Sequence, residues 1–445
     1  MTVPLSQILL FLLAGIGLIV LLTAIFRIHA FFALVLASFL VGLGVEMPMA
    51  QIIATVKDGF GNIMKSLGLI IVLGTTLGVL LESTGSTRVM AAYILRKTGE
   101  RYASIGMSIT GFVVGLPIFC DSGFIVLYGL NKPLAGRTGI PITQISISLA
   151  TGLYSVHCLI PPHPGAAAAA GTIGADIGKL ILIGIAVAIP AMLVGYWWAR
   201  FATRNEKQMK VPEPENDTGV GHTKMPSPVN AFLPVVAPIV LIAAKSFLTL
   251  EKDSGGWLLS TLSVLGDPVI ALSIGVLLAL FCGRNLTKAT IGKLLSEGAE
   301  KAGSILIIIG AGGAFGAVLA AANLGQHLGN LGFLKHLGIL FPFLLTFMLK
   351  TAQGSSTVAI ITAASIVEPL LAVLGLESAN GRLLAVLSMG AGSMMISHAN
   401  DAYFWVISRF SEIEMKSMLR VYSFGTILMG LITFLVVFVL SMVIL

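Results

Sequence analysis

The stretch GLPIFCDSGFIVL, residues 115–127, places a polar group in the middle of an apolar segment and decides how the rest of the chain folds. Gly115 and Pro117 interrupt a helix, and Asp121 follows within the next turn's length. A carboxylate at the centre of a membrane costs about 3 kcal/mol or more, so such residues are generally functional. The fold therefore has to contain a helix break at membrane depth.

The composition predicts a polytopic membrane protein. Of 445 residues, 56% are hydrophobic and 11% are charged, whereas soluble domains carry roughly 25% charged residues. Several apolar segments are shorter than the ~20 residues that a span needs, and they flank the most polar motifs. We therefore expect an all-α fold of roughly 12–14 membrane segments in a lipid bilayer, with discontinuous helices or re-entrant hairpins. The net charge of +7 lies in short connections, where it sets topology and does not indicate nucleic acid binding.

An internal repeat divides the chain. A polar linker, 204–229, separates a first membrane half, 1–203, from a second, 230–445. GLIIVLGTTLGVLLESTG (68–85) resembles ILIIIGAGGAFGAVLAAANLG (305–325), and two later motifs match in the same order at a nearly constant offset. Two such halves, often inverted, build many secondary transporters, whose substrate sites lie near the bilayer midplane.

Small polar residues begin a fresh apolar helix in each half. The first half contributes Ser122 and Gly123, and the second contributes Ser355, Ser356 and Thr357. A helix N-terminus offers unpaired N–H groups and a partial positive charge, which suits an anionic ligand. The alternative is that these residues only cap their helices.

Two carboxylates are candidates for carrying a proton. Asp121, when protonated, can donate a hydrogen bond to an anion and remove the repulsion between the two charges. Asp401 in GAGSMMISHANDAYFWV (390–406) is the second candidate. The alternative for Asp121 is a helix cap held by backbone N–H groups.

Three histidines and one asparagine lie beside the other helix breaks. His157 and His163 occur in SVHCLIPPHPGAAAAAG (155–171), whose prolines end the preceding helix. His398 and Asn400 lie in the 390–406 motif. With His157 and His163 they are candidates for binding the substrate, although each histidine can equally be structural. No cysteine or carboxylate stands at ligand spacing from the histidine pair, so we expect no metal site.

Four motifs together resemble the GntP family of bacterial gluconate:proton symporters, within the ion transporter superfamily. They are VHCLIPPHPGA, ILIIIGAGGAF, GSSTVA and SHANDAYFW, and the resemblance covers nearly the whole chain. It implies uptake of a sugar acid such as gluconate across the bacterial inner membrane, driven by a proton gradient without a cofactor. It also implies two inverted repeats, a homodimer and an elevator-like motion. One departure is FCDSG, where family members often have FFEVG, and it puts the substrate in doubt.

The chain is therefore expected to be a transporter and not an enzyme, with a proton symporter for a small hydroxylated carboxylate as the leading hypothesis. A Na⁺-coupled carboxylate transporter, or a family member for D-serine, glycerate or another hydroxy or amino acid, is the near alternative. A channel would need a continuous polar pore, whereas the polar residues cluster in broken regions. An intramembrane enzyme built on Ser397 and His398 is disfavoured because adjacent helical residues do not face each other.

Overall fold

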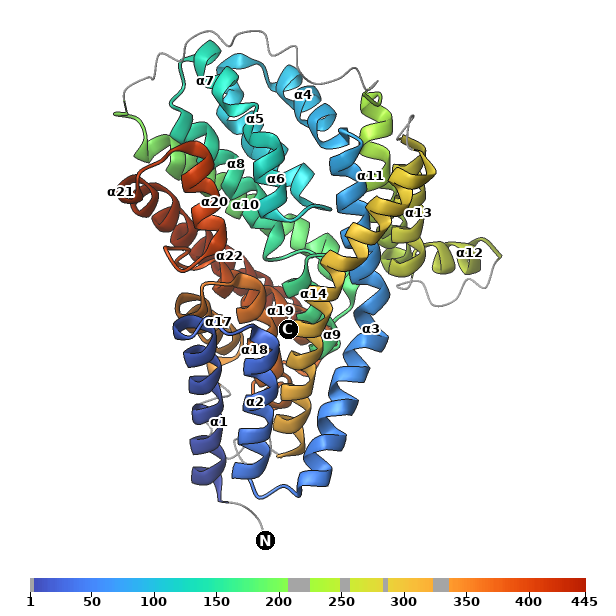
Figure 1. Cartoon of the computed structure of the whole chain (residues 1–445), viewed down its shortest axis with the longest axis vertical. Coiled ribbons are helices and arrows are strands. Elements are labelled where there is room, and N and C mark those ends of the chain that lie inside the picture. The colour runs from blue at the N-terminus through green and yellow to red at the C-terminus, as the bar shows by residue number, and fades with distance from the viewer. Residues whose placement is uncertain (1–3, 207–224, 249–256, 283–286, 323–335) are drawn as a thin grey trace.

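The computed structural model describes residues 4–206, 225–248, 257–282, 287–322 and 336–445, and every regular element in these ranges is helical (Figure 1). Six of the described helices are long and apolar enough to cross a membrane. Four further apolar helices are shorter, as the sequence predicts for segments next to helix breaks. The all-α polytopic fold is thus confirmed.

The elements fall into two series that follow the same order. The first series is α1 (Leu5–Val20), η1 (Leu21–Ile25), α2 (Ala30–Gly44), α3 (Met49–Ser83), α4 (Ser86–Thr98), η2 (Glu100–Tyr102), α5 (Ala103–Gly115), α6 (Cys120–Tyr128), α7 (Asn131–Thr138), α8 (Ile142–His157), α9 (Pro164–Ile173) and α10 (Ile177–Ala202). The second is α11 (Pro228–Leu248), α12 (Trp257–Leu265), α13 (Pro268–Cys282), α14 (Lys288–Ala321), α17 (Leu340–Gln353), α18 (Ser356–Val367), η3 (Glu368–Leu370), α19 (Ala379–Met394), α20 (Ala402–Ser411), α21 (Met415–Ser417), η4 (Met418–Ser423) and α22 (Phe424–Ile444).

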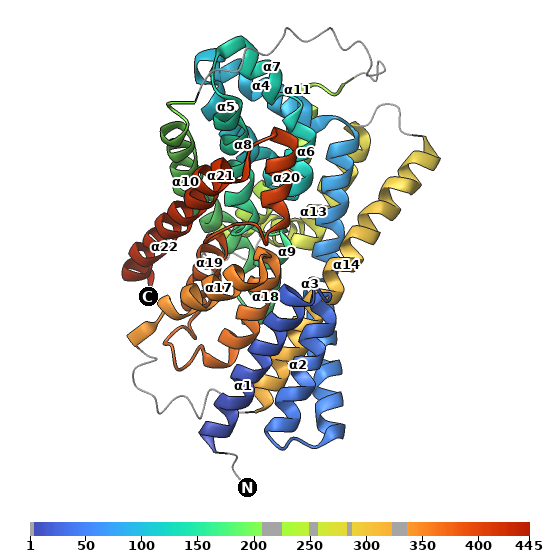
Figure 2. The same cartoon turned by 60° about the vertical axis from the view of Figure 1, so that its left-hand side comes forward.

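The long helices α3 and α14 are the clearest equivalent pair, and they pack side by side in opposite directions (Figures 1 and 2). A Cβ on Gly59 of α3 would lie 2.6 Å from the Gly313 carbonyl oxygen of α14. In return, a Cβ on Gly298 of α14 would lie 2.6 Å from the Thr76 hydroxyl of α3. Gly59 and Gly298 occupy equivalent positions in the two repeats. The inverted arrangement of α3 and α14 therefore uses the same kind of contact twice, once from each helix. The glycine-rich run of α14 is therefore a close-packing surface on a continuous helix, and not an unwound segment.

Both long helices begin earlier than the apolar pattern predicts. Apolar spans are expected over 64–82 and 303–321, but the helices extend back to Met49 and Lys288. The added turns of α3 carry Lys57 and Asp58, whose side chains are exposed while the opposite face packs inside. A charged stretch that looks like a connection is therefore an amphipathic extension of the same helix.

Each half also contains one helical hairpin and one broken helix. The hairpins are α5–α6 and α17–α18, and the broken helices are α8–α9 and α19–α20. Each hairpin packs on the broken helix of its own half through a glycine. A Cβ on Gly152 of α8 would overlap the Ser108 carbonyl of α5, and a Cβ on Gly392 of α19 would overlap the Phe343 carbonyl of α17. This repeated packing brings both hairpin tips to both helix breaks.

Candidate functional site

A cavity of about 480 Å³ lies where the two hairpin tips meet the helix breaks. Its volume is within the ~300–1,000 Å³ of small-molecule sites. The lining residues come from both halves of the chain, as expected for a transporter built of two repeats. They are Phe119, Cys120, Asp121, Ser122, Tyr154, His157, Pro164, Lys301, Ser304, Ile305, Gln353, Gly354, Ser355, Ser356, Thr357, Asn400, Asp401, Ala402 and Tyr403.

Asp121 and Ser122 line the cavity from the first turn of α6. The Asp121 Oδ1 atom is buried and has no hydrogen-bond partner among the residues that the structure describes. A carboxylate that only capped its helix would accept backbone hydrogen bonds with its oxygens. Gly123 does not line the cavity, because a Cβ there would lie 2.8 Å from a Leu153 methyl, which indicates a packing role.

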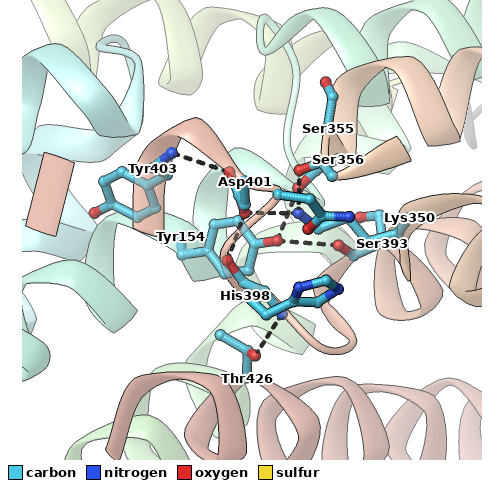
Figure 3. A network of polar contacts seen from close by, with 12 residues as sticks. Tyr154, Lys350, Ser355, Ser356, Ser393, His398, Asp401, Tyr403 and Thr426 are labelled. Carbon is cyan, nitrogen blue, oxygen red and sulfur yellow. Dashed lines mark hydrogen bonds and ion pairs between the residues drawn. The ribbon is translucent and has the colours of Figure 1, made fainter. Parts of the chain in front are cut away.

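The second hairpin presents its three hydroxyl residues to the cavity. Ser355 caps α18 by accepting a hydrogen bond from the Val358 N–H at 3.3 Å. The Ser356 hydroxyl lies 2.7 Å from the Tyr154 hydroxyl, which also donates to the Ser393 carbonyl at 3.0 Å (Figure 3). Tyr154 therefore ties the first half to the second hairpin, and Ser356 and Thr357 place their free backbone N–H groups at the start of α18.

A buried ion pair holds Asp401. Lys350 near the end of α17 is fully buried and places Nζ 2.6 Å from Asp401 Oδ2. The same carboxylate accepts hydrogen bonds from the Ser397 hydroxyl at 2.5 Å and from the Tyr403 N–H at 3.0 Å (Figure 3). Asp401 lines the cavity, but both of its oxygens are already engaged, in contrast to Asp121.

Lys350 is a residue that the sequence interpretation missed. It stands at the end of the apolar run LFPFLLTFMLK (340–350), four residues before the GSST loop. A lysine in that position has the same cost as a buried aspartate and carries the same signal of a function or a partner. The apolar pattern predicts an end at the lysine, whereas α17 continues to Gln353.

The histidines and Asn400 fall into different environments. His157 lines the cavity, and its Nδ1 is buried without a partner among the described residues. His163 lies behind the wall, where its Nε2 is 2.7 Å from the Gly115 carbonyl oxygen, and His398 lies 3.3 Å from the Thr351 carbonyl oxygen. Neither lines the cavity. Asn400 does, but its Nδ2 donates to that Thr351 carbonyl at 2.8 Å, so its Oδ1 is the remaining polar atom for a ligand.

Gln353 is the second residue that the sequence interpretation missed. It is the last residue of α17, it lines the cavity, and both its Nε2 and Oε1 atoms are buried without partners among the described residues. No sequence signal marks it, because a glutamine at the end of an apolar helix is usually an exposed polar residue.

The charges of the site can be summed from these contacts. The Lys350 ammonium compensates the Asp401 carboxylate, and Lys301, which also lines the cavity, is paired with Glu297 at 2.8 Å. Asp121 is then the carboxylate that decides the net charge at the hairpin tips. An ionised Asp121 makes the site negative, and a protonated Asp121 makes it neutral. The helix starts of α6 and α18 add partial positive charge. The arrangement can therefore bind a proton and an anion together.

Comparison with known proteins finds a family match and several related permeases. The family described as "GntP family permease" matches residues 7–443. The chain is 34% identical to a gluconate permease of Pseudomonas aeruginosa, covering 96% of both chains. It is 31% identical to the high-affinity gluconate transporter of Escherichia coli, covering 92% of this chain and 93% of that one.

A solved structure shares the fold. The YdaH transporter of Alcanivorax borkumensis, described as having an unusual topology, matches with a TM-score of 0.54 at 17% identity, over 86% of this chain and 87% of that chain. These proteins are permeases and transporters, not enzymes. The chain therefore belongs to the GntP permease family, as a multi-pass transporter of the bacterial inner membrane.

Proposed function

We propose that this permease takes up gluconate or a related hydroxylated carboxylate by proton symport, with Asp121 carrying the proton. The observation that supports the proposal most directly is the unpaired Asp121 carboxylate at the cavity, opposite a second carboxylate that is fully paired. The gluconate names of two relatives with full coverage support the choice of substrate.

The substrate carboxylate would lie between the starts of α6 and α18. There the first-turn N–H groups and the hydroxyls of Ser122 and Thr357 supply donors that an anion needs, whereas the Ser356 hydroxyl already donates to Tyr154. Asp121 lies in the same first turn of α6. An ionised Asp121 would repel the anion, so binding favours the protonated carboxyl, and this linkage couples the two ligands.

The substrate hydroxyls would extend toward unpaired groups further along the cavity, among them His157 Nδ1 and Asn400 Oδ1. Proton and anion then move as a neutral pair. The loaded site then carries one negative charge instead of two, and this reduces the cost of moving it through the membrane interior, where an unpaired charge is expensive.

The test is uptake of labelled gluconate into proteoliposomes under an imposed inward proton gradient or an inward Na⁺ gradient. We expect accumulation with protons alone. Asp121→Asn removes the titratable group and keeps the size of the side chain, so it should abolish accumulation while gluconate counterflow persists.

The matched control is Asp58→Asn, the same substitution at an exposed position of α3, which should accumulate gluconate like the parent protein. Accumulation that depends on Na⁺ instead of protons, or a fully active Asp121→Asn variant, would refute proton coupling through Asp121.

A further inference from the structure

We propose that the Gln353 side chain forms hydrogen bonds with the hydroxyl groups of the substrate. It thereby selects polyhydroxylated acids over acids of equal length without hydroxyls. The inference rests on the proposed function, since it names the part of the sugar acid that the same cavity recognises. It is carried by a separate observation, the unpaired amide at the tip of the second hairpin.

The amide of Gln353 lacks partners although it is enclosed. The residue is 9% exposed, and neither Nε2 nor Oε1 has a hydrogen-bond partner within the described part of the chain. About 90% or more of buried polar groups are hydrogen-bonded in folded proteins. Two unpaired atoms on one side chain that lines a cavity therefore indicate a group that a ligand completes.

The chemistry of an amide identifies the complementary group. Nε2 donates and Oε1 accepts, and a hydroxyl likewise donates and accepts. A carboxylate only accepts, so it cannot satisfy Oε1. Neighbouring hydroxyls of a sugar acid can satisfy both ends of the amide, whereas an alkyl chain would leave both unpaired. Asn400 cannot replace Gln353 here, because its Nδ2 is already bonded to the hairpin.

The backbone around Gln353 is held in place from within its own hairpin and from the second broken helix. Lys350 Nζ donates to the Gly354 carbonyl at 2.5 Å, and Asn400 Nδ2 donates to the Thr351 carbonyl at 2.8 Å. Gly354 has a φ of +82° and packs against the Asn400 backbone. A polar group on a fixed backbone, with no partner of its own, is pre-organised for a ligand.

The hairpin itself does not require a glutamine. Counting back from the helix starts at Cys120 and Ser356, the position that corresponds to Gln353 in the first hairpin is Pro117. Proline has no side-chain donor or acceptor, yet that hairpin turns as well. Gln353 therefore breaks the symmetry of the two repeats at the cavity, which is expected of a residue that serves the substrate.

The test measures binding of gluconate and of hexanoate to the purified full-length protein by calorimetry. Gln353→Leu keeps the approximate size of the side chain and removes both polar atoms. We expect gluconate affinity to fall about ten-fold or more, the value of a lost hydrogen bond to the hydroxyl chain, while hexanoate affinity stays the same or rises. Without ligand, the unfolding midpoint of the variant should be no lower than that of the parent protein.

The matched control is Thr351→Val on the same helix. The Thr351 hydroxyl donates to the Phe347 carbonyl at 2.9 Å and does not line the cavity, so gluconate affinity should be unchanged. The proposed function fails, and this inference with it, if the parent protein binds no gluconate. The inference alone fails if the parent protein binds gluconate and Gln353→Leu binds it equally well. An equal loss of both acids, or a lowered unfolding midpoint, would show that Gln353 only packs the site.

Discussion

At the scale of single residues, the Lys350–Asp401 pair should stabilise the fold and not carry the proton. Removing one partner of a buried pair typically costs 3–5 kcal/mol, because the other charge stays buried and uncompensated. We expect Lys350→Met or Asp401→Asn alone to lower the unfolding midpoint of the purified protein markedly. The double variant should lose less than the sum of the two, because no unpaired charge remains.

The exposed pair Lys132–Glu412 provides the control. Its atoms lie 3.0 Å apart, but the side chains are 50% and 70% exposed, so Lys132→Met should change stability by about 1 kcal/mol or less. Strict additivity of the two buried substitutions would contradict the paired-charge interpretation of Lys350 and Asp401.

Part of the candidate site can be predicted from the types of residue in the sequence. Asp121, Ser356 and Thr357 can be singled out from the sequence because polar residues in apolar segments are rare, and the structure places them at one cavity. Lys350 carries the same signal and was recoverable. His163 and His157 look alike in sequence, yet the first is bonded to a carbonyl and the second is unpaired. Gln353 stands out because its partners are missing, which is a property of three-dimensional packing.

At the scale of elements, the tip of the second hairpin should depend on Gly354. Alanine there would meet two obstacles, a left-handed φ of +82° and overlap of its Cβ with the Asn400 backbone. The strain alone costs roughly 1–3 kcal/mol, and relief of the overlap would shift the tip away from the second broken helix. Gly354→Ala should therefore abolish gluconate uptake in proteoliposomes.

Gly375 provides the control that separates backbone strain from overlap with the Asn400 backbone. It has a similar φ of +72° but open space around its Cβ position, so Gly375→Ala should be strained yet keep its uptake rate. Equal loss in both variants would mean that backbone strain alone, and not the contact between hairpin and broken helix, explains the result.

The helix breaks can be predicted from the sequence, but the starts of the two longest helices cannot. The breaks in α8–α9 and α19–α20 are predictable, because proline or a cluster of polar residues interrupts an apolar run. The first turns of α3 and α14 are not predictable, because their charged residues are typical of a loop between membrane helices. Packing of the opposite face against the partner helix keeps them helical.

At the scale of the whole molecule, the order of hairpins and crossing helices indicates which connections share a side, and this supports a prediction of the membrane orientation. The α5–α6 hairpin turns back at residues 116–119, whereas the broken helix α8–α9 and the helix α10 each cross once. The ends of α4 and α10 therefore lie on one side. Ion pairs of Lys132 with Glu412 and of Arg420 with Glu206 bring the end of α20 and η4 to the same side.

Basic residues concentrate on this side and are Arg96, Lys97, Arg101, Lys132, Arg137, Arg200, Arg204, Arg409, Lys416 and Arg420. The opposite connections, between α9 and α10 and between α18 and α19, carry Asp176, Glu368 and Glu377 with few basic residues nearby. Because short cytoplasmic loops are enriched in lysine and arginine, we predict that the basic side faces the cytoplasm and that the connection between α18 and α19 faces outward.

Single cysteines introduced at two exposed glutamates test this orientation in a background without the three native cysteines. A membrane-impermeant maleimide should label Glu377→Cys in intact cells with a permeabilised outer membrane. It should label Glu414→Cys only after the inner membrane is opened, because that residue lies just beyond the basic end of α20. The reverse pattern would invert the orientation. Labelling of both positions in intact cells would contradict a single crossing of the broken helix α19–α20, which lies between them.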